Sequence, residues 1–408
     1  MAGFRDMDRL EDMTLDGRRV LVRVDLDCPI DDSGRVTDDS RIQICLPTIR
    51  HLIAEGARVV LASSLGSPGG RRNGRLSMAP VAERLAEILD CDIYLPEDTV
   101  GEGPWKVIME RVEGEVVLLE NLGFHAEDER NDDLFAQRLF GLADVFVNEA
   151  FRLSDRQLAS TVGVAGLFNE KAVGIRFRRE VEMLSRVMTS ADSQLGIIFG
   201  GEDDSFALEY LTGQLGRVQR AFIGSRVALP FLAARGFPTG CVKVDKDKVE
   251  AAGKILSRAQ VRGVDIVLPV DLVVKPSGAG DDDAFTVRAD GIPADCELMD
   301  IGPVTVETFP AAFLTGPDGA RKPVRTLVWH GALGRVGTPA FCQGSANVAK
   351  LVSRSAACAT VIGDEMAELV SRLVLTPFFA HVSAGGDVGV KLMLGRELPA
   401  IKAICGGL

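Results

Sequence analysis

A few isolated histidines and carboxylates are the residues of this sequence that could do chemistry by their type alone. His125 and His330 could act as acids or bases, because imidazole titrates near neutral pH. Most isolated histidines are structural, however, and we give these two that interpretation. Asp203, Asp204 and Asp387 could hold Mg²⁺ through their oxygens. We favour solvated turn or helix-capping residues as the simpler explanation of all three.

The eight cysteines do not form a metal-binding pattern. No two of them are spaced as CxxC, and no histidine stands at zinc-ligand spacing from any of them. Their positions are Cys28, Cys45, Cys91, Cys241, Cys296, Cys342, Cys358 and Cys405. We therefore expect no metal site and no disulfide framework.

Short apolar strands alternate with amphipathic helices along the whole chain. The predicted strands are residues 19–24, 58–63, 116–120, 145–148, 195–199, 221–224, 264–269, 326–329 and 359–362. The predicted helices are residues 46–54, 79–89, 133–142 and 180–188. Apolar strands separated by helices predict parallel sheets that are covered on both faces.

The length of 408 residues favours two domains, because single domains usually have about 100 to 200 residues. We predict an α/β fold of two doubly wound, Rossmann-like parallel-sheet domains joined by a helical hinge. The first domain is expected at residues 1–175 and the second at 176–393, with residues 394–408 packing back on the first. Ligands of such sheets bind beyond the carboxyl ends of the strands, so the loops that follow each strand are the candidate sites.

The net charge of −12 argues against nucleic acid as the main partner, since a duplex binder needs a basic face. The one dense basic cluster, Arg71, Arg72 and Arg75, is best explained as a solvated loop. The N-terminal stretch is acidic and has no apolar segment of a signal peptide, and no run of about 18 apolar residues occurs. We expect a cytoplasmic protein that does not bind membranes.

Several loops resemble the signature motifs of the phosphoglycerate kinase family. Residues 23–29, RVDLDCP, are similar to the family's RVDFNVP, and residues 119–125, LENLGFH, are similar to LENLRFH. Further matches in family order and spacing are DDSRI at 38–42, LPTI at 46–49, SSLGSP at 63–68, FGG at 199–201, LPVD at 268–271, DIGP at 300–303 and HVSAGG at 381–386. The resemblance spans essentially the whole chain and implies the phosphoglycerate kinase fold.

This resemblance implies a reaction and its ligands. In the family, ATP and 3-phosphoglycerate give ADP and 1,3-bisphosphoglycerate, a step of glycolysis. The first domain would bind 3-phosphoglycerate, the second would bind Mg-ATP or Mg-ADP, and hinge closure would exclude water. A small-molecule phosphate ligand and a monomeric chain are the corresponding expectations.

On the substrate side, the resemblance implies four binding residues. They are Asp25, Asp27, Arg41 and Arg156, of which Arg41 is also the candidate catalytic residue. Asp27 stands where the family has Asn, which adds negative charge where a phosphorylated acid should approach. The competing interpretation of the two arginines is a surface or interdomain salt bridge.

The family's basic patch, in contrast, is mostly replaced. Its histidines and arginines correspond here to Ser64, Ser67, Gly123, Asp155 and Leu158. In addition, the Asp of the family's NDAFG motif is Glu149. Phosphoryl transfer depends on alignment and on cations that hold the charge of the moving group, so these losses predict slow transfer.

On the nucleotide side, the resemblance retains glycines and loses charges. The candidate nucleotide-binding residues are Gly200, Gly201, Gly224, Gly363, Gly385 and Gly386. Both lysines of the family's GGAKVSDK are replaced, by Asp203 and Ala207, and Met366 replaces the metal-linked Asp of GGGDT. Side chains occupy former glycine positions at Ser225 and Arg226, and Gly337 replaces the Glu expected near the ribose. Asp387 stands in the last glycine motif, where it could cap the following helix. We therefore expect impaired Mg-nucleotide binding.

Three hypotheses follow. The first is a pseudoenzyme with weak or no phosphoryl transfer that binds or regulates a protein partner of unknown identity. The second is a working kinase in which other basic residues compensate, the candidates being Arg152, Arg176, Arg226 and Arg335. The third is a repurposed enzyme with another ligand, because a fold does not fix a function.

Overall fold

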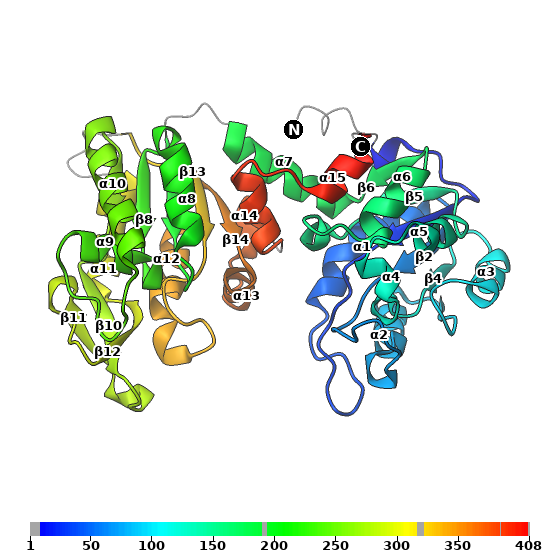
Figure 1. Cartoon of the computed structure of the whole chain (residues 1–408), viewed down its shortest axis with the longest axis horizontal. Coiled ribbons are helices and arrows are strands. Elements are labelled where there is room, and N and C mark those ends of the chain that lie inside the picture. Colours follow the sequence, from blue (N-terminus) through cyan, green and yellow to red (C-terminus); the bar gives the residue numbers. More distant parts are fainter. Residues whose placement is uncertain (1–8, 190–193, 316–321, 384, 407–408) are drawn as a thin grey trace. The chain divides into compact units, whose positions relative to one another are not determined.

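The computed structural model describes residues 9–189, 194–315, 322–383 and 385–406. It is an α/β structure that divides into two compact units (Figure 1). The first unit contains the described residues of Met1–Glu182 and Gly395–Leu408, and the second contains those of Met183–Leu394. Each unit has a six-stranded parallel sheet, so the expected fold class is confirmed. The expected boundaries and the substrate and nucleotide roles of the two halves stay predictions.

The sheet of the first unit has the strand order β3-β4-β2-β1-β5-β6. Its strands are β1 (Arg19–Arg23), β2 (Arg58–Ala62), β3 (Ile93–Tyr94), β4 (Val116–Leu118), β5 (Val145–Asn148) and β6 (Lys171–Val173). The strands are short and mostly apolar, and those other than the edge strand β3 are largely buried, as parallel strands between helices should be. The chain order reverses between β1 and β5, so their carboxyl ends form the switch point at which such sheets bind ligands.

Eight helices contribute to the described part of the first unit, and one of them comes from the end of the chain. They are α1 (Ser40–Ala54), α2 (Ala79–Leu89), α3 (Glu102–Met109), α4 (Ala126–Glu129), α5 (Asp133–Phe140), α6 (Val164–Leu167), the first half of α7 (Ile175–Thr189) and α15 (Pro399–Ile404). Helix α15 packs against α6 and β6. Its Ala400 N–H donates to the carbonyl of Ser154 at 3.1 Å. The boundary between the two units falls within α7, after Glu182.

The parallel sheet of the second unit has the strand order β15-β14-β13-β7-β8-β9. Its strands are β7 (Leu195–Phe199), β8 (Arg220–Ile223), β9 (Asp265–Val267), β13 (Thr326–His330), β14 (Cys358–Ile362) and β15 (His381–Ser383). Here the chain order reverses between β7 and β13. The loops after these two strands therefore lie at the switch point of the second unit.

A three-stranded antiparallel sheet in the second unit was not expected from the sequence. Its strands, in the order β11-β10-β12, are β10 (Asp271–Pro276), β11 (Phe285–Arg288) and β12 (Cys296–Ile301). The helices of this unit are the second half of α7, α8 (Ser205–Gln214), α9 (Leu229–Ala234), α10 (Lys246–Arg262), α11 (Pro303–Phe309), α12 (Gln343–Ser353), α13 (Asp364–Arg372) and α14 (Asp387–Met393). Among the described helices of either unit, none combines the length and the apolar character that crossing a membrane requires.

Candidate functional site

The switch point of the first unit brings Asp25 and Arg41 together. Asp25 follows β1, and Arg41 is the second residue of α1. The Nη1 group of Arg41 donates to both carboxylate oxygens of Asp25, at 3.0 and 2.9 Å. The side chains of Arg41 and Asp25 remain 28% and 16% exposed, so a ligand can reach the pair. Two of the residues expected to bind substrate are thus in direct contact.

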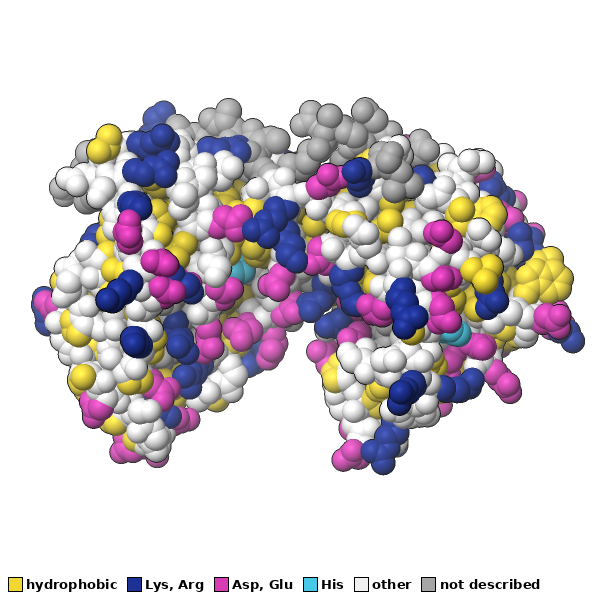
Figure 2. All heavy atoms as spheres, in the orientation of Figure 1, with side chains coloured by type: hydrophobic (Ala, Val, Ile, Leu, Met, Phe, Trp, Pro, Cys, Tyr) yellow, Lys and Arg dark blue, Asp and Glu magenta, His cyan; other side chains and the backbone are white. Residues whose placement is uncertain are grey.

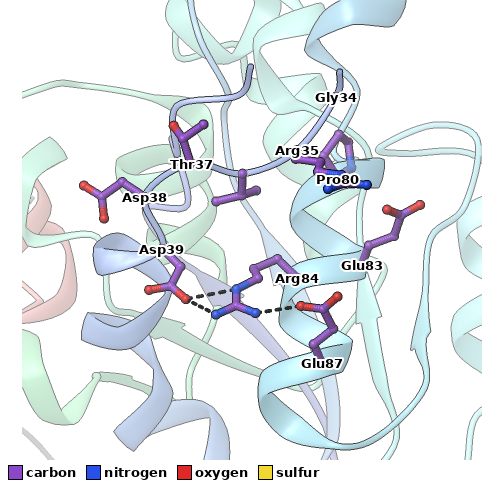
Figure 3. Close-up of a pocket in the computed structure, with 10 residues that line it drawn as sticks. Gly34, Arg35, Thr37, Asp38, Asp39, Pro80, Glu83, Arg84 and Glu87 are labelled. Atoms are coloured by element: carbon purple, nitrogen blue, oxygen red, sulfur yellow. Dashed lines mark hydrogen bonds and ion pairs between the residues drawn. The ribbon is translucent and has the colours of Figure 1, made fainter. Parts of the chain in front are cut away.

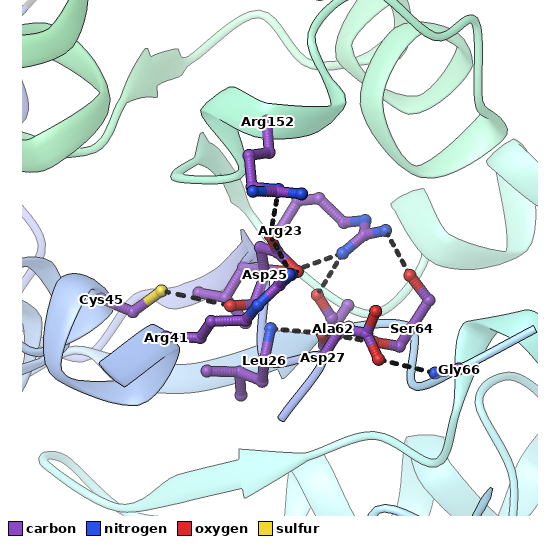
Figure 4. A network of polar contacts seen from close by, with 12 residues as sticks. Arg23, Asp25, Leu26, Asp27, Arg41, Cys45, Ala62, Ser64, Gly66 and Arg152 are labelled. Carbon is purple, nitrogen blue, oxygen red and sulfur yellow. Dashed lines mark hydrogen bonds and ion pairs between the residues drawn. The ribbon is translucent and has the colours of Figure 1, made fainter. Parts of the chain in front are cut away.

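Arg152 approaches the same carboxylate from another element (Figure 4). It lies in the short 3-10 helix Phe151–Leu153, which follows β5. Its Nε is 3.8 Å from Oδ2 of Asp25. Because β1 and β5 are neighbouring strands, the loops after them meet at the switch point. Asp25 is therefore flanked by two guanidinium groups, and Arg152 stands where the NDAFG motif has glycine.

Asp27 is committed to holding a loop. Its Oδ1 accepts the Gly66 N–H at 2.7 Å, and the neighbouring Leu26 N–H donates to Ser63 Oγ at 2.9 Å. These two bonds fix the loop that carries Ser64, one of the residues in place of the basic patch. The contacts of Asp27 therefore support the local backbone, and they leave its carboxylate beside the expected acid site.

Arg23 also lies at this site, although it was not among the binding residues expected from the sequence. The side chain is completely buried, and it donates to Ser160 Oγ at 2.9 Å and to Ser64 Oγ at 3.1 Å. Ser160 in turn donates from its N–H to Asp128 at 2.8 Å. Burial lowers the pKa of Arg23, while the charges of Asp128 and Asp25 raise it. Arg23 ends β1 and is the first residue of the motif RVDLDCP, which is the sequence signal that could have identified it.

Arg156 does not join Asp25 and Arg41. Its Nη2 contacts the carboxylate of Glu129, at the end of α4, and both side chains are about half exposed. The charge of Arg156 nevertheless reaches the site, because it contributes to lowering the pKa of Arg23. The four residues expected to bind substrate are therefore divided between a central pair, a loop clamp and a peripheral ion pair.

The position of Gly123, where the family motif has arginine, is closely packed. A Cβ atom at Gly123 would lie 2.9 Å from Cγ of Pro68 and 3.0 Å from Oδ1 of Asn121. Two bonds hold this turn, because the Gly123 N–H donates to Asn121 Oδ1 at 2.8 Å and the Gly123 carbonyl accepts the Gly70 N–H at 3.0 Å. A side chain at position 123 would therefore press against Pro68 and Asn121, so the arginine of the family motif would not fit this loop without a shift of its neighbours.

Glu149 is a buried carboxyl group at the start of α7. Its Oε1 accepts the Phe177 N–H at 2.8 Å, and its Oε2 contacts the hydroxyl of Thr48 on α1. Thr48 Oγ1 also accepts the Ile175 N–H at 2.8 Å. Burial raises the pKa of Glu149 to about 8, against the effect of these hydrogen bonds. A Cβ at Gly174 would overlap the carboxylate, so glycine there makes room for the longer side chain.

A polar pocket of about 550 Å³ lies between the loop before α1 and helix α2 (Figure 3). Arg84 of α2 crosses it and pairs with Asp39 and with Glu87, both at 2.6 Å. Arg84 therefore neutralises part of the acidic charge that lines the pocket. Asp39 is the residue before α1, so this pairing fixes the start of the helix that carries Arg41.

In the second unit, the expected glycines have packing reasons of their own. A Cβ at Gly200 would overlap the carbonyl oxygen of Ala332, and one at Gly331 would overlap that of Gly200. The Gly201 N–H donates to the Ala332 carbonyl at 2.6 Å. A Cβ at Gly224 would lie 2.6 Å from Cδ2 of Leu333. These glycines therefore allow the loops after neighbouring strands to pack closely. This packing requires glycine whether or not a nucleotide binds.

The later glycine motifs keep their backbone shape. Gly363 has φ +112° and Gly386 has φ +52°, both conformations that favour glycine. Gly385 donates its N–H to Ser383 Oγ at 3.2 Å. Helix α14 begins at Asp387 with Gly386 as its N-cap, and no side chain caps it. The expectation that Asp387 caps this helix is therefore wrong, because its carboxylate is inside the first turn.

His330 is the central polar residue at the switch point of the second unit. It ends β13, and its ring packs edge-on against Phe206, with the ring centroids 4.9 Å apart. Burial lowers the pKa of His330 to about 4, although the charges of Asp387 and Asp203 raise it. His330 is therefore neutral at physiological pH and has carboxylates as its charged neighbours.

Carboxylates dominate the loop after β7. Glu202 is 4.0 Å from Arg226, and Asp204 pairs with Lys248. Asp203 accepts the Ser205 N–H at 2.9 Å, and its hydrogen bonds to Ser205 lower its pKa. Figure 2 shows acidic side chains gathered near a histidine on the visible face of this unit.

The arginines proposed to compensate in the second unit already have acidic neighbours. Arg335 contacts Glu297 at 3.2 Å, and Arg226 lies near Glu202, as described above. Met366 is completely buried in the hydrophobic core. Among the described residues, no three His, Cys, Asp or Glu side chains are placed to hold a metal ion together.

Comparisons with known proteins agree with the motifs. A family model described as Phosphoglycerate kinase matches residues 10–396. The chain is 39% identical over 401 residues to a protein named phosphoglycerate kinase from Anaeromyxobacter dehalogenans, with 98% of each covered. It is 37% identical over 395 residues to one from Pelotomaculum thermopropionicum, with 97% of this chain and 98% of that protein covered. The solved structure of phosphoglycerate kinase from Coxiella burnetii is similar with a TM-score of 0.82 at 29% identity, with 98% of both chains covered.

Proposed function

Because the chain belongs to the phosphoglycerate kinase family, we propose that it is a member with weak or no phosphoryl transfer that acts by binding. The family reaction transfers a phosphoryl group between ATP and 3-phosphoglycerate in glycolysis. One observation carries the proposal: His330 has Asp203 and Asp387 as its charged neighbours at the switch point of the second unit. A nucleoside triphosphate would have to bring its negative charges close to these carboxylates.

The electrostatic cost of that approach is large. Each close pair of unit charges contributes about 1 to 4 kcal/mol at exposed or near-surface positions. The kinase motif places a lysine where Asp203 stands, so the substitution removes an attraction and adds a repulsion. Phosphoryl transfer depends mainly on such cations, and losing one costs on the order of 10³ to 10⁵ in rate.

The described residues of the second unit do not fit Mg-ATP or Mg-ADP. Met366, at the position of the metal-linked carboxylate, is buried in the core. Ser225, at a former glycine, has φ +53°, and its side chain now stands where the motif leaves space. Arg226 follows it and faces Glu202. No step of a mechanism can therefore be derived through a bound nucleotide in this chain.

The first unit retains more of its site. Asp25 and Arg41 are in contact and partly exposed, and the switch point gives them an accessible place in the sheet. Our proposal is that this site still binds a small acid. Binding without transfer would suit a regulatory protein of central carbon metabolism, with a protein partner of unknown identity.

A second candidate is a working phosphoglycerate kinase, and the comparisons favour it. The relatives described above carry that name at 37% and 39% identity over nearly the whole chain. Arg152 beside Asp25 is the structural observation on its side, because it adds a cation at the acid site. This candidate requires saturable binding of Mg-ADP. A repurposed enzyme with another ligand, using Arg226 and Arg335, is the third candidate.

Thermal unfolding of the full chain separates these candidates. A ligand that binds only the folded state raises the melting temperature. The proposal predicts no shift with Mg-ADP up to millimolar concentration and a shift with a small acid. A saturable shift with Mg-ADP, accompanied by turnover, would establish the working kinase instead. We also propose a cytoplasmic, monomeric protein, which gel filtration with light scattering would test for its oligomeric state.

A further inference from the structure

The central pair of the acid site has unused donors. A guanidinium group has five N–H donors. Arg41 uses only Nη1, for the two bonds to Asp25, and its Nε and Nη2 make no hydrogen bond to any described residue. Arg152 lies on the same carboxylate from the next loop. The two arginines are thus placed to share a small anion, and Asp25 is placed to accept a hydrogen bond from it.

The charge balance around this point limits the ligand. The described charged groups of the site comprise equal numbers of arginines and carboxylates. They are Arg23, Arg41, Arg152 and Arg156 with Asp25, Asp27, Asp128 and Glu129. A monoanion would add one negative charge to a nearly neutral site. A phosphorylated acid would add about three, which is costly where the dielectric constant is low.

The place of a phosphate group offers no compensation. Ser64 accepts a hydrogen bond from Arg23 and contributes no charge of its own. Ser67 is exposed and neutral. At Gly123 the loop is closed by Pro68, so no side chain reaches out from there. The groups that remain can hold a carboxylate and a hydroxyl group.

We infer that the first unit binds a small monoanionic hydroxy acid in preference to a phosphorylated one. The ligand carboxylate accepts hydrogen bonds from Arg41 and Arg152, and its hydroxyl group donates to Asp25. Arg152 is then the residue that sets this preference, because it adds a cation at the carboxylate end, while Ser64, Ser67 and Gly123 replace cations at the phosphate end. The inference rests on the proposed retention of an acid site and extends it to a ligand class.

Calorimetric titration of the full chain without nucleotide tests this inference. The probes are D-glycerate, 3-phosphoglycerate and inorganic phosphate. We expect D-glycerate to bind at least about tenfold more tightly than 3-phosphoglycerate, a difference of about 1.4 kcal/mol. Equal or tighter binding of 3-phosphoglycerate would overturn the inference, and so would an absence of glycerate binding.

Two arginine variants identify the residue responsible. Arg152→Ala should weaken D-glycerate binding at least about tenfold. Arg18→Ala is the matched control, because Arg18 forms an ion pair with Glu170, at 3.1 Å, near the other end of β1. It should leave the affinity within about twofold. Unchanged binding in Arg152→Ala would refute the role of this residue. Because no nucleotide is present, these results do not depend on whether the chain retains phosphoryl transfer.

Discussion

The rings of His330 and Phe206 pack edge-on, with centroids 4.9 Å apart and planes at 79°. Both residues replace polar residues of the kinase motifs, the Asn of NGPMGVFE and the Asp of GGAKVSDK. They lie at the switch point of the second unit, where the loops after β7 and β13 meet. Two substituted positions have therefore become partners in a small apolar contact. Such a contact stabilises the local packing and offers no charge to a phosphate.

Restoring the first lysine of the family motif should restore some nucleotide binding. The variant Asp203→Lys replaces a carboxylate by a cation, so the attraction of the site for Mg-ADP should increase. We expect at least about a tenfold gain in affinity by calorimetry. Asp282→Lys, in an exposed acidic turn of the same unit, controls for net charge. An equal gain in the control would mean that overall charge, and not the site, is responsible.

His330 should make the fold sensitive to acid. Its pKa is about 4 in the folded chain, below the usual 6.5, because it is buried. Below pH 6.5 the unfolded chain takes up a proton that the folded chain refuses, so stability is lost as the pH falls toward 4. His330→Asn should reduce this loss by about 1 kcal/mol per pH unit, measured by urea unfolding.

The control for that experiment is His125→Asn. His125 lies 2.9 Å from Asp98, on the other unit. Identical profiles for His330→Asn and the original chain would show that His330 is not buried as described.

Glu149 should have the opposite pH dependence. Its pKa is raised from 4.5 to about 8 by burial, so the folded chain holds a proton that the unfolded chain releases above pH 4.5. Stability therefore falls as the pH rises from about 4.5 to about 8, and this contribution levels off above that pH. Glu149→Gln keeps the shape and removes the titration, and it should lessen this fall by on the order of a few kcal/mol. Unfolding at pH 5, 6.5 and 8 measures it.

The exposed Glu127 on α4 provides the comparison for Glu149. Glu127→Gln makes the same chemical change at an exposed position, so it measures what the substitution does without burial. Asp300 has a pKa raised to about 7 by burial, so part of the fall should persist in both variants. A profile for Glu149→Gln that equals the control would contradict the buried position of Glu149.

The lost arginines should differ in whether they can be restored. Gly123→Arg must displace Pro68, and we expect it to destabilise the fold by about 1 to 3 kcal/mol. Ser67→Arg lies on an exposed loop and should change stability by less than about 0.5 kcal/mol. It should also strengthen binding of 3-phosphoglycerate in the calorimeter. If Gly123→Arg were as stable as Ser67→Arg, the loop would not be closed there.

The local elements of this fold could be predicted well from the sequence, and their packing less well. Strands β5 and β7 and helix α2 have the predicted bounds, because short apolar runs and amphipathic periodicity are local properties. Helix α1 begins at Ser40, earlier than the predicted start at residue 46, and Pro47 lies inside the helix. Proline is favoured in the first turn of a helix, but here buried Ile42 and Cys45 hold an earlier turn against the core.

The antiparallel sheet β11-β10-β12 was missed for a physical reason. In β11, Phe285, Thr286 and Arg288 are exposed, so the strand has no apolar run of the kind that marks a parallel strand. The signal that could have identified the sheet is the alternation of buried Leu272 and Val274 in β10.

The candidate site residues also divide into those that the sequence could identify and those whose contacts depend on the folded structure. The resemblance of the motifs named Asp25 and Arg41 as binding residues, and the strand order of the sheet explains why they meet. The partner of Arg156, the closing of the loop at Gly123 and the contact of Glu149 with Thr48 depend on long-range packing. No local pattern could give them. Arg152 illustrates the limit, because its charge is visible in the sequence and its target is not.

The central claim is that the chain has lost the cations for phosphoryl transfer, and the turnover number tests it most directly. The full chain with saturating 3-phosphoglycerate and Mg-ATP would be assayed beside an ordinary phosphoglycerate kinase. We predict a kcat at least about 10³ lower than that of the ordinary enzyme, the cost of a single lost cation. A kcat within about tenfold of the ordinary enzyme would contradict the account and establish a working kinase.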